Sequence, residues 1–301
     1  MKVLVLGGKG FIGRYVVRAL ASRGCDVSIG TRHAKAANEH AFILHQLTRT
    51  DDWRDAVARF DVIVNCVGIL RERWGENYAD VYLHAPAALA QACAAQGRRF
   101  VHITALGLHS KASSGFLTAK LAGEQAITET GGESCIVRPS LLDGPDGFGS
   151  RWLRRVAQWP VHLVPADARG ALAPLDVNEL GEAIAALCAC PRDALPAVVE
   201  LGGETRYQIE HYLKALRTRS AAAYTLHVPA WMVRAAAHAL DVLHLTPLSW
   251  GHVELMRRDN APRVDDAYAL RHWLGRAPTN VGLHNAASAA YATSAEPASN
   301  A

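Results

Sequence analysis

Three glycines near the N-terminus are spaced to hold a phosphate group. They lie in the segment Gly7-Gly8-Lys9-Gly10-Phe11-Ile12-Gly13, directly after an apolar run at residues 3–6. Gly7 permits a sharp turn, Gly10 removes the Cβ that would keep the backbone from a pyrophosphate, and Gly13 lets a helix lie close to the strand. The N-terminus of that helix would face the phosphates. The loop, with Phe11 and Ile12, is therefore predicted to bind a dinucleotide.

The end of the next predicted strand indicates which dinucleotide is bound. An amphipathic helix and a strand at residues 26–30 follow the loop and complete a βαβ unit. An NAD site requires a carboxylate near the end of that strand for the ribose 2′-hydroxyl, but Asp26 comes too early. Arg32 stands there instead and is suited to pair with a 2′-phosphate. This predicts NADP(H) in preference to NAD(H); the alternative is that Arg32 is a solvated strand-end charge.

Strands and helices alternate along the first half of the chain. Further strands are predicted at 41–45, 61–68, 99–104 and 134–138, with helices at 51–60, 78–96 and 116–130 between them. Right-handed crossovers then give an α/β fold, a doubly wound parallel Rossmann sheet with helices on both faces.

The second half of the chain predicts a smaller lobe. We expect a Rossmann core over residues 1–142 and a mixed segment over 143–285, which forms a C-terminal substrate-side lobe and returns a late strand, at 198–201, to the sheet. Helices are expected at 152–159, 178–188 and 209–216, and two more after Pro229. Residues 286–301 are rich in Ala, Ser and Asn and are predicted to be a flexible tail.

Composition excludes several classes of protein. A net charge of +4 without basic runs predicts no nucleic-acid partner. The apolar helix expected at 231–245 is too short and too polar to span a bilayer, so it either packs in the lobe or lies at an interface. No secretory signal is apparent, which predicts a cytoplasmic protein. The six cysteines are read as buried hydrophobes, and the fourteen histidines lack metal-type spacing, so no metal is expected.

In order and spacing these motifs resemble the extended and atypical branch of the short-chain dehydrogenase/reductase superfamily. The likeness rests on the glycine spacing, on Asn65-Cys66-Val67-Gly68 after the fourth strand, and on Thr104-Ala105-Leu106-Gly107 after the fifth. The chain is also similar to the nucleotide-binding accessory subunit of respiratory complex I and its bacterial relatives, from Met1 to about Asn260. The resemblance implies that Cys66, Val67 and Gly68 contact the dinucleotide.

The superfamily resemblance also implies a catalytic corner. In that arrangement a tyrosine four residues before a lysine exchanges a proton with a substrate oxygen while hydride moves at the nicotinamide. Lys120 matches the lysine that also holds the nicotinamide ribose, Thr104 matches the hydroxyl that orients a carbonyl, and Arg138 shapes the nicotinamide end. The tyrosine position is Phe116. Because a positioned acid or base contributes roughly 10²- to 10⁴-fold in rate, ordinary reductase activity is expected to be weak or absent.

Three functions remain open from the sequence. In the first, NADP(H) is a structural or sensing ligand, and the lobe serves a protein or membrane-assembly partner, with the protein cytoplasmic or peripheral at the inner membrane. In the second, the chain is an NADP-dependent reductase or epimerase/dehydratase that acts on a carbonyl or sugar-like substrate. In the third, it is a regulator that responds to the ratio of oxidised to reduced cofactor.

Overall fold

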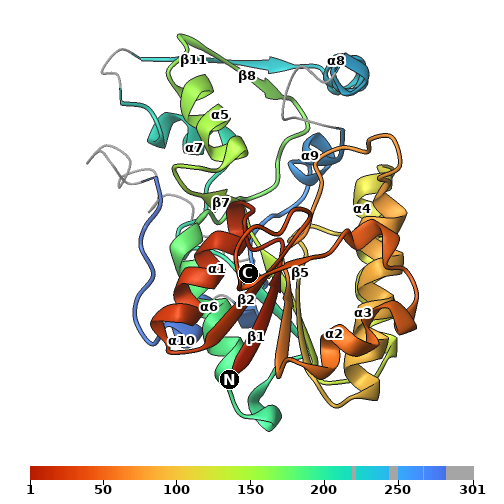
Figure 1. The fold of residues 1–301 in the computed structure, drawn as a ribbon. Helices are drawn as coiled ribbons and strands as arrows, with labels where there is room; N and C mark the ends of the chain where they lie inside the picture. The colour runs from red at the N-terminus through yellow and green to blue at the C-terminus, as the bar shows by residue number, and fades with distance from the viewer. Residues whose placement is uncertain (219–221, 244–249, 267, 283–301) are drawn as a thin grey trace.

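A seven-stranded parallel sheet organises the chain (Figure 1). The computed structural model describes residues 1–218, 222–243, 250–266 and 268–282, so the tail predicted at 286–301 lies outside the described residues. The strand order β10-β6-β5-β4-β1-β2-β3 confirms the doubly wound α/β fold. The strands are β1 Lys2–Leu6, β2 Asp26–Thr31, β3 Glu39–Ala41, β4 Val62–Asn65, β5 Arg99–Ile103, β6 Ser134–Pro139 and β10 Val198–Leu201.

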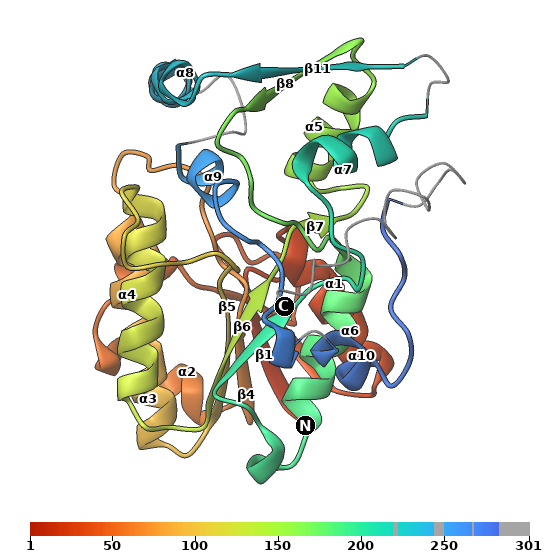
Figure 2. The ribbon, with the colours of Figure 1, turned by 180° about the vertical axis from the view of Figure 1, so that it is seen from behind.

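Helices cover both faces of this sheet, as Figures 1 and 2 show from opposite sides. One face carries α1 Phe11–Ser22, α6 Val177–Ala189 and α10 Ala269–Leu274. The other carries α2 Arg54–Ala58, a π-helical turn Asp80–His84, α3 Ala85–Ala95 and α4 Gly115–Glu129. Each face therefore has its own apolar core.

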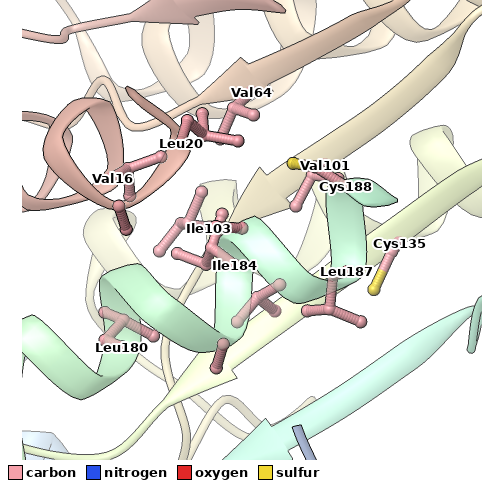
Figure 3. Close-up of a cluster of buried hydrophobic side chains, with 14 of the residues drawn as sticks. Val16, Leu20, Val64, Val101, Ile103, Cys135, Leu180, Ile184, Leu187 and Cys188 are labelled. Carbon is pink, nitrogen blue, oxygen red and sulfur yellow. The ribbon is translucent and has the colours of Figure 1, made fainter. Parts of the chain in front are cut away.

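The core under α1 and α6 is shown in Figure 3. Val16 and Leu20 of α1 meet Ile184 of α6 above Val101 of β5, and all four side chains are fully buried. Gly181 permits this close packing, because a Cβ there would lie 2.8 Å from the carbonyl oxygen of Tyr15. The late strand expected at 198–201 is β10, which pairs with β6 and extends the same sheet.

Two local predictions in the first half are wrong in detail. The strand expected at 41–45 is β3, which ends at Ala41; residues 44–46 instead form a 3-10 turn that buries Leu44. The helix expected at 78–96 runs from residue 78 to 95, but residues 80–84 within it form a π-helical turn, in which the N–H of Ala85 donates to the carbonyl of Asp80. Pro86 cannot donate to the carbonyl of Tyr82, which prevents regular α-helical bonding there.

A smaller lobe lies above the carboxyl ends of the strands (Figures 1 and 2). It contains α5 Phe148–Ala157, α7 Ile209–Ala215, α8 Ala230–Leu243 and α9 Trp250–Leu255. Its two-stranded parallel sheet joins β8 Val161–Pro165 to β11 Tyr224–Val228, and neither strand was predicted. A second short pair, β7 Leu142–Asp143 with β9 Leu175–Asp176, lies between lobe and core. No helix of the described residues is long and apolar enough to cross a membrane.

Residues 258–263, which we call the strap, return from the lobe to the core. The backbone N–H of Asn260 donates to Ala171 at 2.7 Å, and its side-chain amide donates to the carbonyl of Leu106 at 2.9 Å. The hydroxyl of Ser140 donates to oxygens of the same asparagine. The backbone N–H of Arg263 donates to Glu200 on β10 at 2.9 Å. The strap therefore fastens the lobe to the end of the main sheet.

Candidate functional site

A cavity of about 630 Å³ opens at the carboxyl ends of β1, β2 and β4. Six of the residues predicted to bind the dinucleotide line it: Gly7, Gly10, Arg32, Cys66, Val67 and Gly68. The loop at 69–76 lines the side of the cavity next to Gly68, and Phe148 lines it from the lobe. The structure thus brings the glycine loop, the end of β2 and the end of β4 around one space.

The glycine loop has the geometry that the sequence requires of it. Gly7 has φ +73° and accepts a 2.8 Å hydrogen bond from the N–H of Gly10. A Cβ on Gly13 would lie 2.2 Å from the carbonyl oxygen of Gly7, so only glycine fits this contact.

The N-terminus of α1 is open to a ligand. In the described part of the chain no side chain caps this helix, which leaves its first N–H groups, those of Phe11, Ile12 and Gly13, without the usual side-chain partner. The ring of Phe11 itself turns toward Gly144 and Gly147 of the lobe. An uncapped N-terminus beside a glycine turn fits the pyrophosphate of a dinucleotide.

The rim of the cavity is mostly cationic. Lys9, Arg32, Arg71 and Arg73 all line it. The ammonium of Lys9 lies 2.6 Å from a carboxylate oxygen of Glu39 on β3, and this hydrogen bond holds the pKa of Glu39 below its usual value. Such a rim is suited to phosphate groups. Glu39 escaped the sequence analysis because β3 begins two residues before the segment predicted for it.

Two buried side chains hold the end of β4 in shape. The side-chain oxygen of Asn65 accepts a 3.0 Å hydrogen bond from the N–H of Val67, which fixes the loop that lines the cavity. The amide nitrogen of Asn65 lies 3.2 Å from Nδ1 of His102 on β5. Burial lowers the pKa of His102 to about 3, so this histidine is neutral and its Nδ1 accepts the hydrogen bond. This pair cannot be read from the sequence, because Asn65 and His102 meet only through the β4–β5 register.

Lys120 lies buried among aromatic rings. Its side-chain nitrogen is 4.3 Å from the centre of the Tyr82 ring and 5.3 Å from that of Phe116. Burial lowers the pKa of Lys120 to about 8, although the nearby carboxylate of Glu124 acts in the opposite direction. The electron-rich faces of the two rings attract the ammonium and replace part of the solvation that it loses on burial.

Phe116, at the position implied for the catalytic tyrosine, belongs to an aromatic cluster. Its ring centre lies 5.6 Å from that of Tyr78, 5.5 Å from that of Tyr82 and 5.4 Å from that of His252, and the side chain is buried. The hydroxyl of Tyr82 accepts from the N–H of Ile69 at 2.8 Å and donates to the carbonyl of the same residue at 2.5 Å. Tyr82 therefore anchors the loop at the cavity and has its hydroxyl engaged.

Thr104 and Arg138 lie in a buried charge network. The hydroxyl of Thr104 donates to Glu124 at 2.5 Å, and Arg138 donates to both oxygens of the same carboxylate. Arg138 also lies 3.5 Å from Glu200 on β10. Neither residue is among those that line the cavity, nor is Lys120. The contacts with substrate or cofactor implied for these three side chains stay predictions.

The described residues give no sign of a metal centre. Among them, no group of three or more His, Cys, Asp or Glu side chains is arranged to hold an ion. All six cysteines are free thiols, three of them buried.

Solved structures with the same fold include nucleotide-sugar epimerases, one of them in complex with NAD. The UDP-glucuronic acid 4-epimerase of Bacillus cereus, in complex with UDP-glucuronic acid and NAD, superposes with a TM-score of 0.64 at 15% identity and covers 94% of this chain and 96% of its own. A nucleoside-diphosphate-sugar epimerase of Staphylococcus aureus gives a TM-score of 0.69 at 13% identity over 94% and 98% of the two chains. At these identities the likeness shows the fold.

Two relatives are more similar in sequence. The chain is 29% identical over 225 residues to the mitochondrial NADH dehydrogenase (ubiquinone) 1 alpha subcomplex subunit 9 of Rattus norvegicus, across 70% of this chain and 59% of the relative. It is 26% identical over 194 residues to the ceramide reductase of Caulobacter vibrioides, across 63% and 61%. The chain therefore spans about three fifths of the length of these relatives.

A family model gives the broader assignment. The model of the NAD dependent epimerase/dehydratase family matches residues 3–187. This range includes the whole glycine loop, β4 and α4, the helix that carries Lys120. The fold and the cavity agree with that match, and the resemblance to complex I subunit 9 is confirmed by the rat relative. The chain belongs to the NAD dependent epimerase/dehydratase family, in the extended branch of the short-chain dehydrogenases/reductases.

Proposed function

We propose that this protein binds NADP(H) as a resident ligand and has weak or no ordinary reductase activity. The observation that carries the proposal is Phe116. At the position where the superfamily resemblance implies a tyrosine, a buried ring packs between Tyr78, Tyr82 and His252. The ammonium of Lys120 faces aromatic rings at this corner. Because a phenylalanine ring replaces the tyrosine hydroxyl, this site can hold a dinucleotide but has no group at that position to exchange a proton with a substrate.

The preference for NADP(H) is supported by the charge around the adenosine end. Arg32 lines the cavity at the end of β2, where an NAD site requires a carboxylate. The carboxylate that does lie nearby, Glu39, is neutralised by Lys9 at 2.6 Å. A 2′-phosphate would meet Arg32 in a charge-assisted contact.

The role of the bound ligand is structural or sensory in this proposal. A nucleotide that binds only the folded chain stabilises it by mass action. The relative from Rattus norvegicus is named as a subunit of NADH dehydrogenase. We accordingly propose that the present chain is a cytoplasmic protein, peripheral at the inner membrane, that presents a nucleotide-stabilised lobe to a protein or membrane partner.

A fluorescence titration with NADPH and NADH tests the proposal. We expect NADPH to bind more tightly than NADH by at least roughly tenfold, and to leave slowly when chased. The Arg32→Ala variant should bind the two nucleotides about equally. Arg23→Ala is the matched control, because Arg23 is exposed at the far end of α1 and does not line the cavity. Failure to bind either nucleotide, or equal affinity in the unmodified protein, would refute the proposal.

A second function is favoured by the lowered pKa of Lys120. A buried amine with a pKa of about 8 keeps its proton at pH 7 but releases it just above neutral pH, much closer to it than an exposed lysine does, and an acid–base catalyst is effective in that range. Together with the relative named ceramide reductase, this favours an NADP-dependent reductase, or an epimerase or dehydratase, on a carbonyl or sugar-like substrate.

Phe116→Tyr discriminates between the two functions. If the protein is a reductase, the hydroxyl restored by Phe116→Tyr should raise the rate at which NADPH is oxidised in the presence of carbonyl substrates. Adding Lys120→Met to that variant should abolish this increase in rate. A binding protein should show no turnover with either variant while its affinity for NADPH, measured in parallel, reports that the site is intact.

A further inference from the structure

The outer face of the lobe sheet is apolar and exposed. In the parallel pair of β8 and β11, Val161 lies beside Tyr224 and Leu163 lies beside Leu226. These four side chains are 39%, 77%, 57% and 57% exposed, in that order. Between them His162 and Val164 point inward and are buried. Four of the six outward positions of this small sheet therefore expose large hydrophobic side chains, and the other two, Pro165 and Val228, are half-buried.

The exposed surface continues onto α8, which follows β11 directly. Trp231 is 72% exposed and Met232 is 46% exposed at the start of this helix. The helix rests on α9 through Val233 and Ala237, which pack with Trp250 and Val253. Figures 1 and 2 show α8 at the end of β11, at the margin of the molecule. We call the surface formed by Val161, Leu163, Tyr224, Leu226, Trp231 and Met232 the lobe face.

Two exposed arginines flank β8 in the sequence: Arg155 of α5 lies just before it and Arg169 just after it. Neither forms an ion pair with any described residue. Of the acidic side chains nearby, Asp167 is paired with Arg257 at 2.6 Å, and Glu210 lies 3.5 Å from His211 and 3.7 Å from His227, which offset its charge only when protonated. The region around β8 therefore has an excess of positive charge.

We infer that the lobe face binds the surface of a bilayer that contains anionic lipids. Aromatic rings of tryptophan and tyrosine beside aliphatic side chains, with arginines close by, are the combination that suits the interfacial zone of a membrane. The residues that line the 630 Å³ cavity include none of the lobe face, so the two sites are separate. Charge favours this partner over a second copy of the chain, whose own face would carry the same excess of arginine.

Co-sedimentation of the full chain with lipid vesicles tests the inference. We expect binding to vesicles of phosphatidylcholine with phosphatidylglycerol, and weaker binding to phosphatidylcholine alone or in high salt. The double variant Leu163→Glu/Leu226→Glu should bind at least roughly tenfold more weakly. Arg155→Gln/Arg169→Gln should lose roughly tenfold on anionic vesicles only.

Matched controls separate the lobe face from general surface hydrophobicity. Val264 and Tyr268 are 84% and 68% exposed but lie outside the face, so Val264→Glu/Tyr268→Glu should leave vesicle binding unchanged. The inference names the membrane partner that the proposed function leaves open. NADPH titration and thermal unfolding of each variant report folding, so lost vesicle binding with an intact nucleotide site supports the inference separately from the proposed nucleotide binding. The inference would be overturned if the unmodified protein did not bind vesicles, or if Val264→Glu/Tyr268→Glu lost as much vesicle binding as the lobe-face variant. It would also be overturned if light scattering showed a dimer that Leu163→Glu/Leu226→Glu dissociates.

Discussion

At the scale of single residues, Lys120 combines two properties that usually exclude each other. It is a cation with a buried side chain, and its nearest neighbours are the rings of Tyr82 and Phe116. Burial favours the neutral amine and lowers its pKa to about 8, from a model-peptide value of 10.5. The folded protein thus gives up this proton at a lower pH than the unfolded chain does, and the buried ammonium costs stability at neutral pH.

Lys120→Met is expected to raise the free energy of unfolding by about 1–3 kcal/mol near pH 7. Between the folded pKa of about 8 and the unfolded value near 10.5, the unfolded chain binds more protons at this site, so the stability of the unmodified protein rises with pH. The variant lacks that rise. Urea unfolding of both proteins at about pH 7 and about pH 10 measures the difference, which should shrink at the higher pH. A variant that is less stable at neutral pH would contradict this account.

Thr104→Val is expected to destabilise the protein by about 1–3 kcal/mol while leaving NADPH affinity unchanged. The hydroxyl of Thr104 is a donor to the buried carboxylate of Glu124, which would lose one of its partners. Thr118→Val is the control, since that hydroxyl bonds only to carbonyls of its own helix turn. Thermal unfolding and nucleotide titration measure the two effects, and a loss of affinity without a loss of stability would show that Thr104 serves the ligand.

The sequence predicts the residues whose role follows from local chemistry. Gly7 and Gly10 were found because a phosphate loop needs glycine at fixed spacing, and Phe116 because its place relative to Lys120 is set by one helix. Glu39 and His102 were not found, because their partners are distant in sequence: Glu39 on β3 meets Lys9 of the glycine loop, and His102 meets Asn65 through the β4–β5 register. Sequence spacing carries no information on such contacts.

At the scale of elements, the irregular start of α3 explains how closely α4 packs. Because Pro86 has no N–H, the carbonyl of Tyr82 is left outside the regular helical bonding, and Gly123 of α4 lies against it. A Cβ on Gly123 would come 1.8 Å from that oxygen. The aromatic cluster around Phe116 depends on this contact, since Tyr82 and Phe116 lie on the two elements that it joins.

Gly123→Ala is therefore expected to destabilise the protein by more than about 2 kcal/mol and to weaken NADPH binding, because α4 and Lys120 must move outward. Gly149→Ala is the matched control. Gly149 is also in a helix, α5, but a Cβ there would meet nothing within 4 Å, so alanine should stabilise by about 0.5–1 kcal/mol. Thermal unfolding of both variants decides the matter, and similar effects of the two changes would contradict the packing argument.

Strands of the core were predicted more reliably than those of the lobe. The parallel strands β1 and β4 are buried on both faces and contain the apolar runs Val3–Leu6 and Val62–Val64. By contrast, β8 and β11 expose one face, and their outward residues are apolar where an ordinary half-buried strand has polar ones. Apolar and polar residues do alternate in β11, Tyr-Thr-Leu-His-Val, but both strands are only five residues long and their apolar positions face solvent, so neither strand was predicted as part of the core.

At the scale of the whole molecule, the strap makes lobe and core one cooperative unit. Asn260 bonds at once to Ala171 of the lobe connection and to Leu106 and Ser140 of the core. Asn260→Ala keeps the backbone bonds to Ala171 and Ser140, but the carbonyl of Leu106 loses its amide donor and Ser140 loses one of its two acceptors, so we expect the free energy of unfolding to fall by about 1–3 kcal/mol. Calorimetry should show a single transition for the unmodified protein; two resolved transitions would mean that lobe and core unfold separately.

The place of β10 in the sheet has a consequence for the chain as it is made. β6 gains its outer neighbour only when β10 is synthesised, roughly 60 residues later. At translation rates of about 5–20 residues per second, the hydrogen-bonding edge of β6 stays unpaired for seconds. During that interval the nascent Rossmann sheet carries an open, apolar edge strand, the kind of surface that recruits other chains. In a crowded cell the nascent chain should therefore depend on chaperones until β10 has been synthesised and pairs with β6.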